Sequence, residues 1–227
     1  ISTIKASMDT TKSINVVSYG IDNTGATDVT KKLNELFLKV SKEKYQEVIF
    51  PDGTYKIENP VKIFCPEKMN RSLVIRSEST YGVTIICDHT DASSGEPIGF
   101  VLTRNAPENQ DGEVLNAYNI TIDGFVFKVK DQDVDGSNFK FISTETTIST
   151  LLFTNVKLIN LRMTNTKDCA GNNIDLTAQC NNLTIDNVKT NYGMYAVYLE
   201  YSNGINNSIS NIVSNNCTYC FSTYSYA

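Results

Sequence analysis

The sequence has few of the residues that metal sites and membrane segments need. It contains a single histidine among 227 residues, whereas zinc sites take several Cys, His or carboxylate ligands. No apolar run approaches the roughly 20 residues required to cross a bilayer. We therefore expect no zinc site and no membrane insertion. The length suits one domain with a sizeable core.

Positive charge is also scarce. Lysine and arginine total 20 against 25 acidic residues, which gives a net charge of −5. Basic residues do not cluster beyond pairs such as Lys31-Lys32. Because phosphate recognition requires concentrated positive charge, we expect no nucleic-acid partner.

The six cysteines form no metal-ligand pattern. Cys217 and Cys220 make a single C-x-x-C pair, and the other four stand far apart in the sequence. Unpaired cysteine behaves as a small hydrophobic residue. The spacing therefore favours buried free thiols.

A repeat organises the second half of the chain. The stretch NITIDG at 119–124 returns as NLTIDN at 182–187. An asparagine followed three positions later by an aliphatic residue recurs at Asn119, Asn155, Asn182 and Asn206, in steps of 36, 27 and 24 residues. A period in the mid-twenties with one insertion accounts for these steps.

Short runs within each unit alternate between apolar and polar residues, which is the period of a half-buried strand. Strands at this period without helices between them are typical of a solenoid whose coils stack in parallel. We therefore predict an all-β fold, a parallel β-helix. The recurring asparagine is expected to form a corner and to bond through its side-chain amide to the asparagine of the next coil.

The N-terminal part has a different pattern. Thr27-Asp28 offers an N-cap, and apolar residues follow at helical spacing: Val29, Leu33, Leu36, Phe37 and Val40. We predict a capping helix over about residues 28–44 that covers the open end of the solenoid. Glu47 to Ile57 then reads as strand, Pro-Asp-Gly turn and strand. Residues 1–13 are assigned to an N-terminal linker and 14–227 to the β-helix domain, with repeat coils from about 47 to 227.

Two stretches resemble the opening segment of the pectate-lyase-like single-stranded right-handed β-helix superfamily: INVVSYGIDNTGATDVTKKLNELF and VIFPDGTYKI. The resemblance is strongest to the branch found in phage tailspikes and tail appendages. Val29 departs from it, standing where many relatives have a second Asp before the Thr. The resemblance implies a right-handed β-helix but no single chemistry, because the superfamily contains lyases, hydrolases, epimerases and non-catalytic adhesins.

Two carboxylates are candidates for catalysis. Alternation points Asp175 and Glu200 outward, and aligning Ile174 with Val197 gives a 23-residue coil. Asp175 and Glu200 would then lie roughly 8 Å apart, inside the roughly 6.5–9.5 Å window of inverting glycosidases. One would protonate the leaving oxygen and the other would activate water. Asp168, in a polar turn, is the reserve candidate; solubilising surface carboxylates are the alternative interpretation.

Tyrosines are concentrated in the same coil: Tyr192, Tyr195, Tyr198 and Tyr201. Outward aromatic rings can pack on the apolar faces of sugars. Tyrosine is also enriched at subunit interfaces. Both interpretations, glycan contact and subunit contact, remain open from the sequence.

Asp131, Asp133 and Asp135, followed by Gly136, have the spacing of a calcium loop. Position 12 of that loop is Ile142 rather than a glutamate, which excludes an EF-hand. A structural Ca²⁺ held by an inserted loop and a plain acidic turn are the two interpretations. We expect no required cofactor.

The predicted function is recognition of a bacterial surface polysaccharide, with hydrolysis by the paired carboxylates, by a protein resembling a phage tailspike or tail appendage. That resemblance implies a homotrimer, contact with other virion tail proteins, and a location on the virion tail or in the extracellular space. The final residues, CTYCFSTYSYA, lack a capping element, so we expect further sequence or another chain to cover them. The alternatives are a non-catalytic adhesin or structural tail component, and a secreted polysaccharide lyase.

Overall fold

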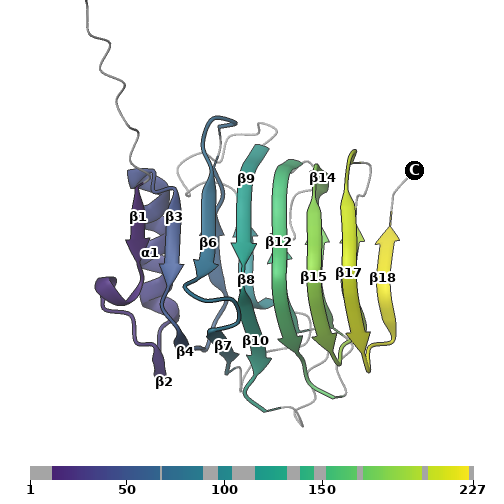
Figure 1. Ribbon diagram of the computed structural model, residues 1–227, viewed down its shortest axis with the longest axis horizontal. Coiled ribbons are helices and arrows are strands. Elements are labelled where there is room, and N and C mark those ends of the chain that lie inside the picture. The colour runs from purple at the N-terminus through teal and green to yellow at the C-terminus, as the bar shows by residue number, and fades with distance from the viewer. Residues whose placement is uncertain are drawn as a thin grey trace, which may run out of the picture.

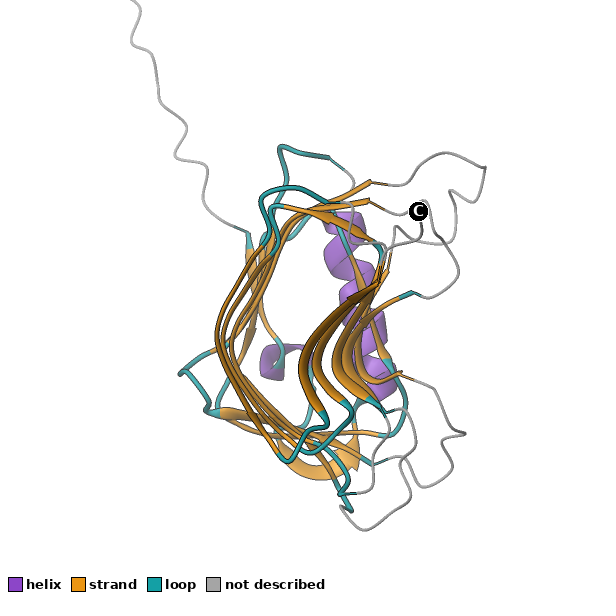
Figure 2. Cartoon of the chain, turned by 90° about the vertical axis from the view of Figure 1, so that its right-hand side faces the viewer, coloured by secondary structure: helices purple, strands orange, loops and turns teal. Residues whose placement is uncertain are grey.

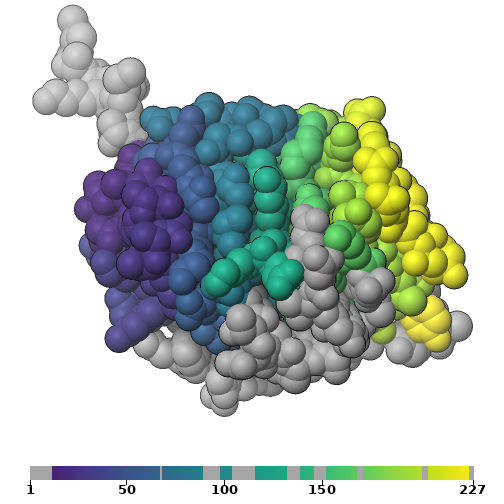
Figure 3. Space-filling view, turned by 90° about the horizontal axis from the view of Figure 1, so that it is seen from below, coloured from purple at the N-terminus to yellow at the C-terminus, as the bar shows by residue number. Residues whose placement is uncertain are grey.

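The chain winds into a parallel β-helix, seen from the side in Figure 1. The computed structural model describes residues 12–66, 68–88, 97–103, 116–131, 139–145, 152–167, 171–200 and 204–224. Every strand pairing in these ranges is parallel, with bonds between coils rather than within them. The space-filling view in Figure 3 shows the coils as successive bands from the N-terminal to the C-terminal end.

The strands form three faces of a tube (Figure 2). The first face contains β1 (Ser13–Asn15), β3 (Glu47–Phe50), β6 (Leu73–Ser77), β9 (Asn116–Asp123) and the first parts of β12 (Leu152–Thr164), β15 (Thr184–Asn191) and β17 (Ser208–Asn215). The second contains β2 (Thr24–Asp28), β4 (Gly53–Ile57), β7 (Val83–Cys87), β10 (Phe125–Val129) and the remainders of β12, β15 and β17. The third contains β5 (Val61–Phe64), β8 (Pro97–Thr103), β11 (Lys140–Thr144), β13 (Asn172–Thr177), β16 (Tyr195–Glu200) and β18 (Tyr219–Tyr224). Short β14 (Gln179–Asn181) pairs with the start of β12.

The register confirms the predicted repeat. Ile122 pairs with Leu158, Leu158 with Ile185, and Ile185 with Ile209. These pairs reproduce the steps of 36, 27 and 24 residues. Parallel stacking therefore turns the sequence period into columns of equivalent side chains.

Asparagines form the corners of the tube in left-handed backbone conformation, with φ between 53° and 59°: Asn119, Asn155, Asn182 and Asn206 at one corner and Asn160, Asn187 and Asn211 at the next. At the first corner, the Asn155 amide donates to Asn119 Oδ1 at 2.7 Å, and the Asn182 amide donates to Asn155 Oδ1 at 3.1 Å. At the second, Asn187 donates to Asn160 Oδ1 at 2.7 Å. The predicted ladder is confirmed from Asn119 to Asn182, because asparagine tolerates this conformation and also bonds to the adjacent coil. Asn206 keeps the corner conformation, but no amide bond between Asn206 and Asn182 is present in the described chain.

Helix α1 (Thr30–Glu43) lies across the N-terminal end of the tube, after the short 3₁₀ helix η1 (Val17–Tyr19). Its apolar face is buried as predicted, through Leu33, Leu36, Phe37 and Val40. The predicted N-cap is wrong by a residue: Val29 occupies that position and makes no side-chain cap. Asp28 contributes from one position earlier, since its Oδ1 accepts the Thr30 N–H at 3.0 Å.

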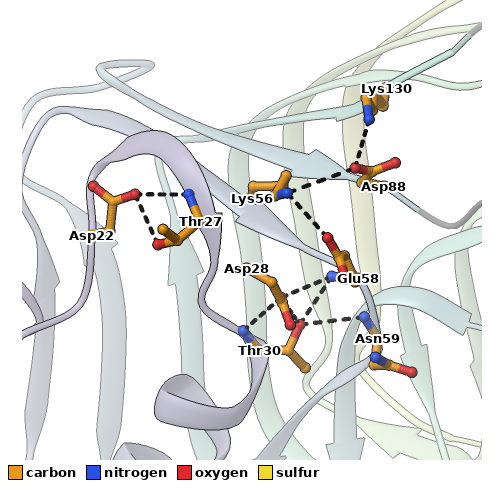
Figure 4. A network of polar contacts seen from close by, with 9 residues as sticks. All are labelled: Asp22, Thr27, Asp28, Thr30, Lys56, Glu58, Asn59, Asp88 and Lys130. Carbon is orange, nitrogen blue, oxygen red and sulfur yellow. Dashed lines mark hydrogen bonds and ion pairs between the residues drawn. The ribbon is translucent and has the colours of Figure 1, made fainter.

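Polar contacts join the start of α1 to the end of β4 (Figure 4). Asp28 Oδ1 and Thr30 Oγ1 both accept the N–H of Glu58, at 3.1 and 3.0 Å. Thr30 Oγ1 also accepts the N–H of Asn59 at 3.3 Å. Thr30 is buried, so these bonds fix the first turn of α1 against the residues that follow β4.

The core is a column of aliphatic and aromatic side chains contributed by all three faces. Phe100 packs edge-on against Phe125 and Phe127, with ring centroids 5.7 and 5.1 Å away. Phe125 also packs against Phe50 at 5.2 Å. These edge-to-face contacts link successive coils through the interior.

The cysteine prediction holds for three residues. Cys65, Cys87 and Cys180 are buried free thiols, and burial raises the pKa of Cys180 to about 12. Cys217 is half-buried and Cys220 is exposed, because no coil packs beyond β18 in the described residues. Cys169 lies outside those residues.

In the described part of the chain, no helix has the length and apolar character needed to cross a membrane.

Candidate functional site

The candidate site lies on the outer surface of the third face. Ile174 pairs with Val197, so the 23-residue coil inferred from the sequence is present. Tyr198 lies beside Asp175, and Glu200 lies beside Thr177. The next strand continues these outward rows with Ser222 and Tyr224.

Asp175 does not lie on an open surface, contrary to the sequence prediction. It is only 2% exposed. Its Oδ2 is 2.9 Å from Lys140 Nζ and accepts a bond from Asn172 Nδ2 at 2.7 Å. Its Oδ1 accepts the Thr177 hydroxyl at 3.0 Å.

The alternation of residues along β13 predicts the direction of the Asp175 side chain, but it does not predict which side chains bury it. One of them is Lys140, which reaches Asp175 from the preceding coil. The carboxylate is enclosed, and both of its oxygens are bonded to neighbouring side chains.

Glu145 is a carboxylate that the sequence reasoning missed. Its N–H donates to Leu102 O at 3.1 Å, which continues the pairing of β11 with β8. Its Oε2 accepts the hydroxyl of Thr103. Thr177 N–H bonds to Thr144 Oγ1 at 2.8 Å, so the end of β11 adjoins Thr177.

This register places Glu145 on one side of Thr177 and Glu200 on the other. Two strand spacings, about 9.6 Å, separate their backbones. Asp175 precedes Thr177 by two residues on β13, so three carboxylates surround one threonine. Ile142 pairs with Ile174, a 32-residue step that the mid-twenties period of the sequence does not predict.

Tyrosine rings stack on the same face, at the start of β16 and β18, while Glu200 lies at the end of β16. Tyr195 and Tyr219 lie with centroids 5.0 Å apart and planes 18° from parallel. Tyr198 approaches Tyr195 at 5.3 Å. Tyr219 is 52% exposed and Tyr224 is 50% exposed, so aromatic surface is accessible at the end of this face.

The remaining predicted residues are not gathered at the site. Tyr192 occupies the turn before β16, with φ of 64°, and its carbonyl accepts Asn173 Nδ2 at 2.9 Å. Asp168 and Tyr201 lie outside the described residues.

The predicted calcium loop falls largely outside the described chain, since only Asp131 is included and Asp133 and Asp135 are not. Among the residues described, no three His, Cys, Asp or Glu side chains are grouped closely enough to hold a metal ion.

Comparison with known proteins agrees with this architecture. Residues 13–93 match the family model for rhamnogalacturonase A/epimerase, pectate lyase-like. A candidate glycosyl hydrolase from Parabacteroides merdae has a structure similar to this chain with a TM-score of 0.52 and 16% identity, covering 92% of this chain and 96% of that one. No curated protein matches the sequence.

Two further solved structures are more distant. The Streptococcus pneumoniae surface protein and adhesin PfbA gives a TM-score of 0.46 at 13% identity, covering 89% of this chain and 60% of its own. ORF18 of Geobacillus virus E2 also gives 0.46, at 16% identity, covering 91% of this chain and 42% of its own. The family match covers the N-terminal part of the chain, and the likeness to the Parabacteroides merdae structure is one of fold.

Proposed function

We propose that this pectate-lyase-like β-helix binds a bacterial surface polysaccharide along its third face. The observation that carries the proposal is the stack of half-buried Tyr195 on exposed Tyr219, on the same face as the carboxylate of Glu200 at the other end of β16. Tyrosine offers an apolar ring to the C–H surface of a sugar and a hydroxyl for hydrogen bonding. The carboxylate of Glu200, at the other end of β16, can accept bonds from sugar hydroxyl groups.

Hydrolysis is the second function that the arrangement supports. Glu145 and Glu200 flank Thr177, with their backbones about 9.6 Å apart by strand spacing. Side chains that lean over Thr177 from these positions bring the two carboxyl groups into the roughly 6.5–9.5 Å spacing used by inverting glycosidases. In this proposal one carboxyl group protonates the glycosidic oxygen and the other removes a proton from the attacking water. Asp175 acts as a positioning residue, because it binds the hydroxyl of Thr177 and the ammonium of Lys140.

We assign the protein to a phage tail appendage, acting as a homotrimer together with other tail proteins on the virion or, failing that, on an extracellular surface. The opening segment that resembles tailspikes supports this assignment. Exposed apolar side chains on β17 and β18, including Val213 and Phe221, support a subunit contact. A secreted lyase is the alternative from another enzyme class, and the unsaturated product that it would form distinguishes it from a hydrolase.

The test is a binding titration against purified capsule and cell-wall polysaccharides. The Tyr195→Ala and Tyr219→Ala variants are expected to weaken binding about tenfold, as buried aromatic contacts commonly do. Tyr118→Ala, on the first face, is the matched control and should bind like the wild type. Unchanged binding in both third-face variants would refute the proposed surface.

Catalysis is tested separately by measuring oligosaccharide release. Glu145→Gln and Glu200→Gln should each abolish release while binding persists, because the amide can neither donate nor remove the required proton. Binding without products in the wild type would leave a recognition protein. An unsaturated product would identify a lyase.

A further inference from the structure

A second surface of the molecule collects positive charge. A groove of about 790 Å³ lies along the second face, over β10, β12, β15 and β17. Its charged lining residues are Lys128, Arg162 and Lys189, and none of the lining residues is acidic. This arrangement is unexpected in a chain whose net charge is −5.

The groove is assembled by the coil register. Arg162 pairs with Lys189 and also with Val126, so these three side chains form one outward row. Lys128 pairs with Thr164, which pairs with Asn191, so they form a second row. Adjacent rungs are about 4.8 Å apart, which brings together cations that lie 27 to 61 positions apart in the sequence.

Arg162 is fixed in place. Its guanidinium lies 4.2 Å from the ring centroid of Tyr81. Its Nη1 donates to the carbonyl oxygens of Leu161 and Asn187 at 2.9 and 3.0 Å. The floor of the groove thus contains a rigid positive charge.

The two lysines are differently placed. Lys128 and Lys189 are exposed, and neither has an ion-pair partner within the described chain. Asp88, in the neighbouring row, is already bound to Lys130 at 2.8 Å (Figure 4). The two ammonium groups therefore have their charge available for a ligand.

We propose that this groove binds an anionic glycan, a polysaccharide that carries carboxylate, sulfate or phosphate groups. Lys128 and Lys189 contact the anionic groups, while Asn191 and Asn215, which line the same groove, bond to sugar hydroxyl groups. A glycan suits the site better than nucleic acid. None of the described lining residues is aromatic, and the ring of Tyr81 is covered by Arg162, so these residues offer single-stranded nucleic acid no platform for base stacking.

The test compares the wild-type chain with the Lys128→Gln/Lys189→Gln variant. The probes are alginate, which carries carboxylates, dextran sulfate, uncharged dextran and a double-stranded DNA oligonucleotide. The double variant is expected to bind one or both anionic polysaccharides about tenfold more weakly, because two exposed charge contacts each contribute a few-fold. Binding should also weaken as salt rises. Lys157→Gln removes an exposed lysine from β12 on the first face and should bind like the wild type.

Equal binding by the wild type and the double variant would overturn the proposal, as would absence of binding to both anionic polysaccharides. Tighter binding to DNA with the same lysine dependence would assign the groove to nucleic acid. The Tyr195→Ala variant leaves the groove intact, so its effect separates this site from the third face.

Discussion

The ion pair between Asp175 and Lys140 predicts a specific pattern of stability. The carboxylate is 2% exposed, and the Lys140 side chain is 16% exposed. Removing one member of a buried pair costs about 3–5 kcal/mol, and the partial exposure of Lys140 favours the lower end. We therefore expect Asp175→Asn to lower the free energy of unfolding by about 3 kcal/mol.

The Asp175→Asn/Lys140→Met double variant leaves neither charge unpaired. It should lie within about 1 kcal/mol of the wild type, because replacing both partners of a buried pair is often nearly neutral. The measurement is urea unfolding followed by far-ultraviolet circular dichroism. Lys62→Met, an exposed lysine on the same face, is the control and should change stability by less than about 0.5 kcal/mol.

The result bears on catalysis as well as on folding. A double variant no more stable than Asp175→Asn would refute the pairing argument, since the loss would not depend on Lys140. If the pairing argument holds, loss of activity in Asp175→Asn must be corrected for misfolding before a chemical role is inferred. Glu200 does not carry this complication to the same degree, because it is only partly buried.

Three further predictions follow from local structure. Asn187→Gly should destabilise the fold by about 1–2 kcal/mol, because it removes hydrogen bonds of the asparagine ladder. Asn206→Gly removes a corner asparagine that makes no ladder bond in the described chain, so it should change the unfolding midpoint little. Equal effects of the two substitutions would contradict the ladder argument. Hydrogen bonds from Ser210 and Asn211 lower the pKa of Asp186. The contribution of Asp186 to folding stability is therefore complete above about pH 4 and is lost as the pH falls through the lower folded-state pKa. Asp186→Asn should flatten the acid side of a plot of stability against pH, and an unchanged acid side would count against this. Mass spectrometry after alkylation near neutral pH should find Cys220 labelled and Cys180 protected in the native state, because burial raises the pKa of Cys180 to about 12; rapid labelling of Cys180 would show that its coil opens.

The sequence by itself determined the architecture. Strand alternation and the recurring corner asparagines specify parallel coils, because each is a local requirement repeated at every turn of the solenoid. The amphipathic pattern from Leu33 to Val40 likewise identified the helix and its buried face. These features depend on neighbouring residues and so can be read along the chain.

Only the tertiary structure decided the functional surfaces. The burial of Asp175 depends on Lys140 from another coil, and Glu145 joins the candidate site through a 32-residue step. The groove likewise depends on the meeting of Lys128 and Lys189. The physical reason is the stacking of the coils. Because the coils differ in length, residues that lie side by side are separated in sequence by distances that no fixed period predicts. The burial of a side chain also depends on which side chains the adjacent coil places over it.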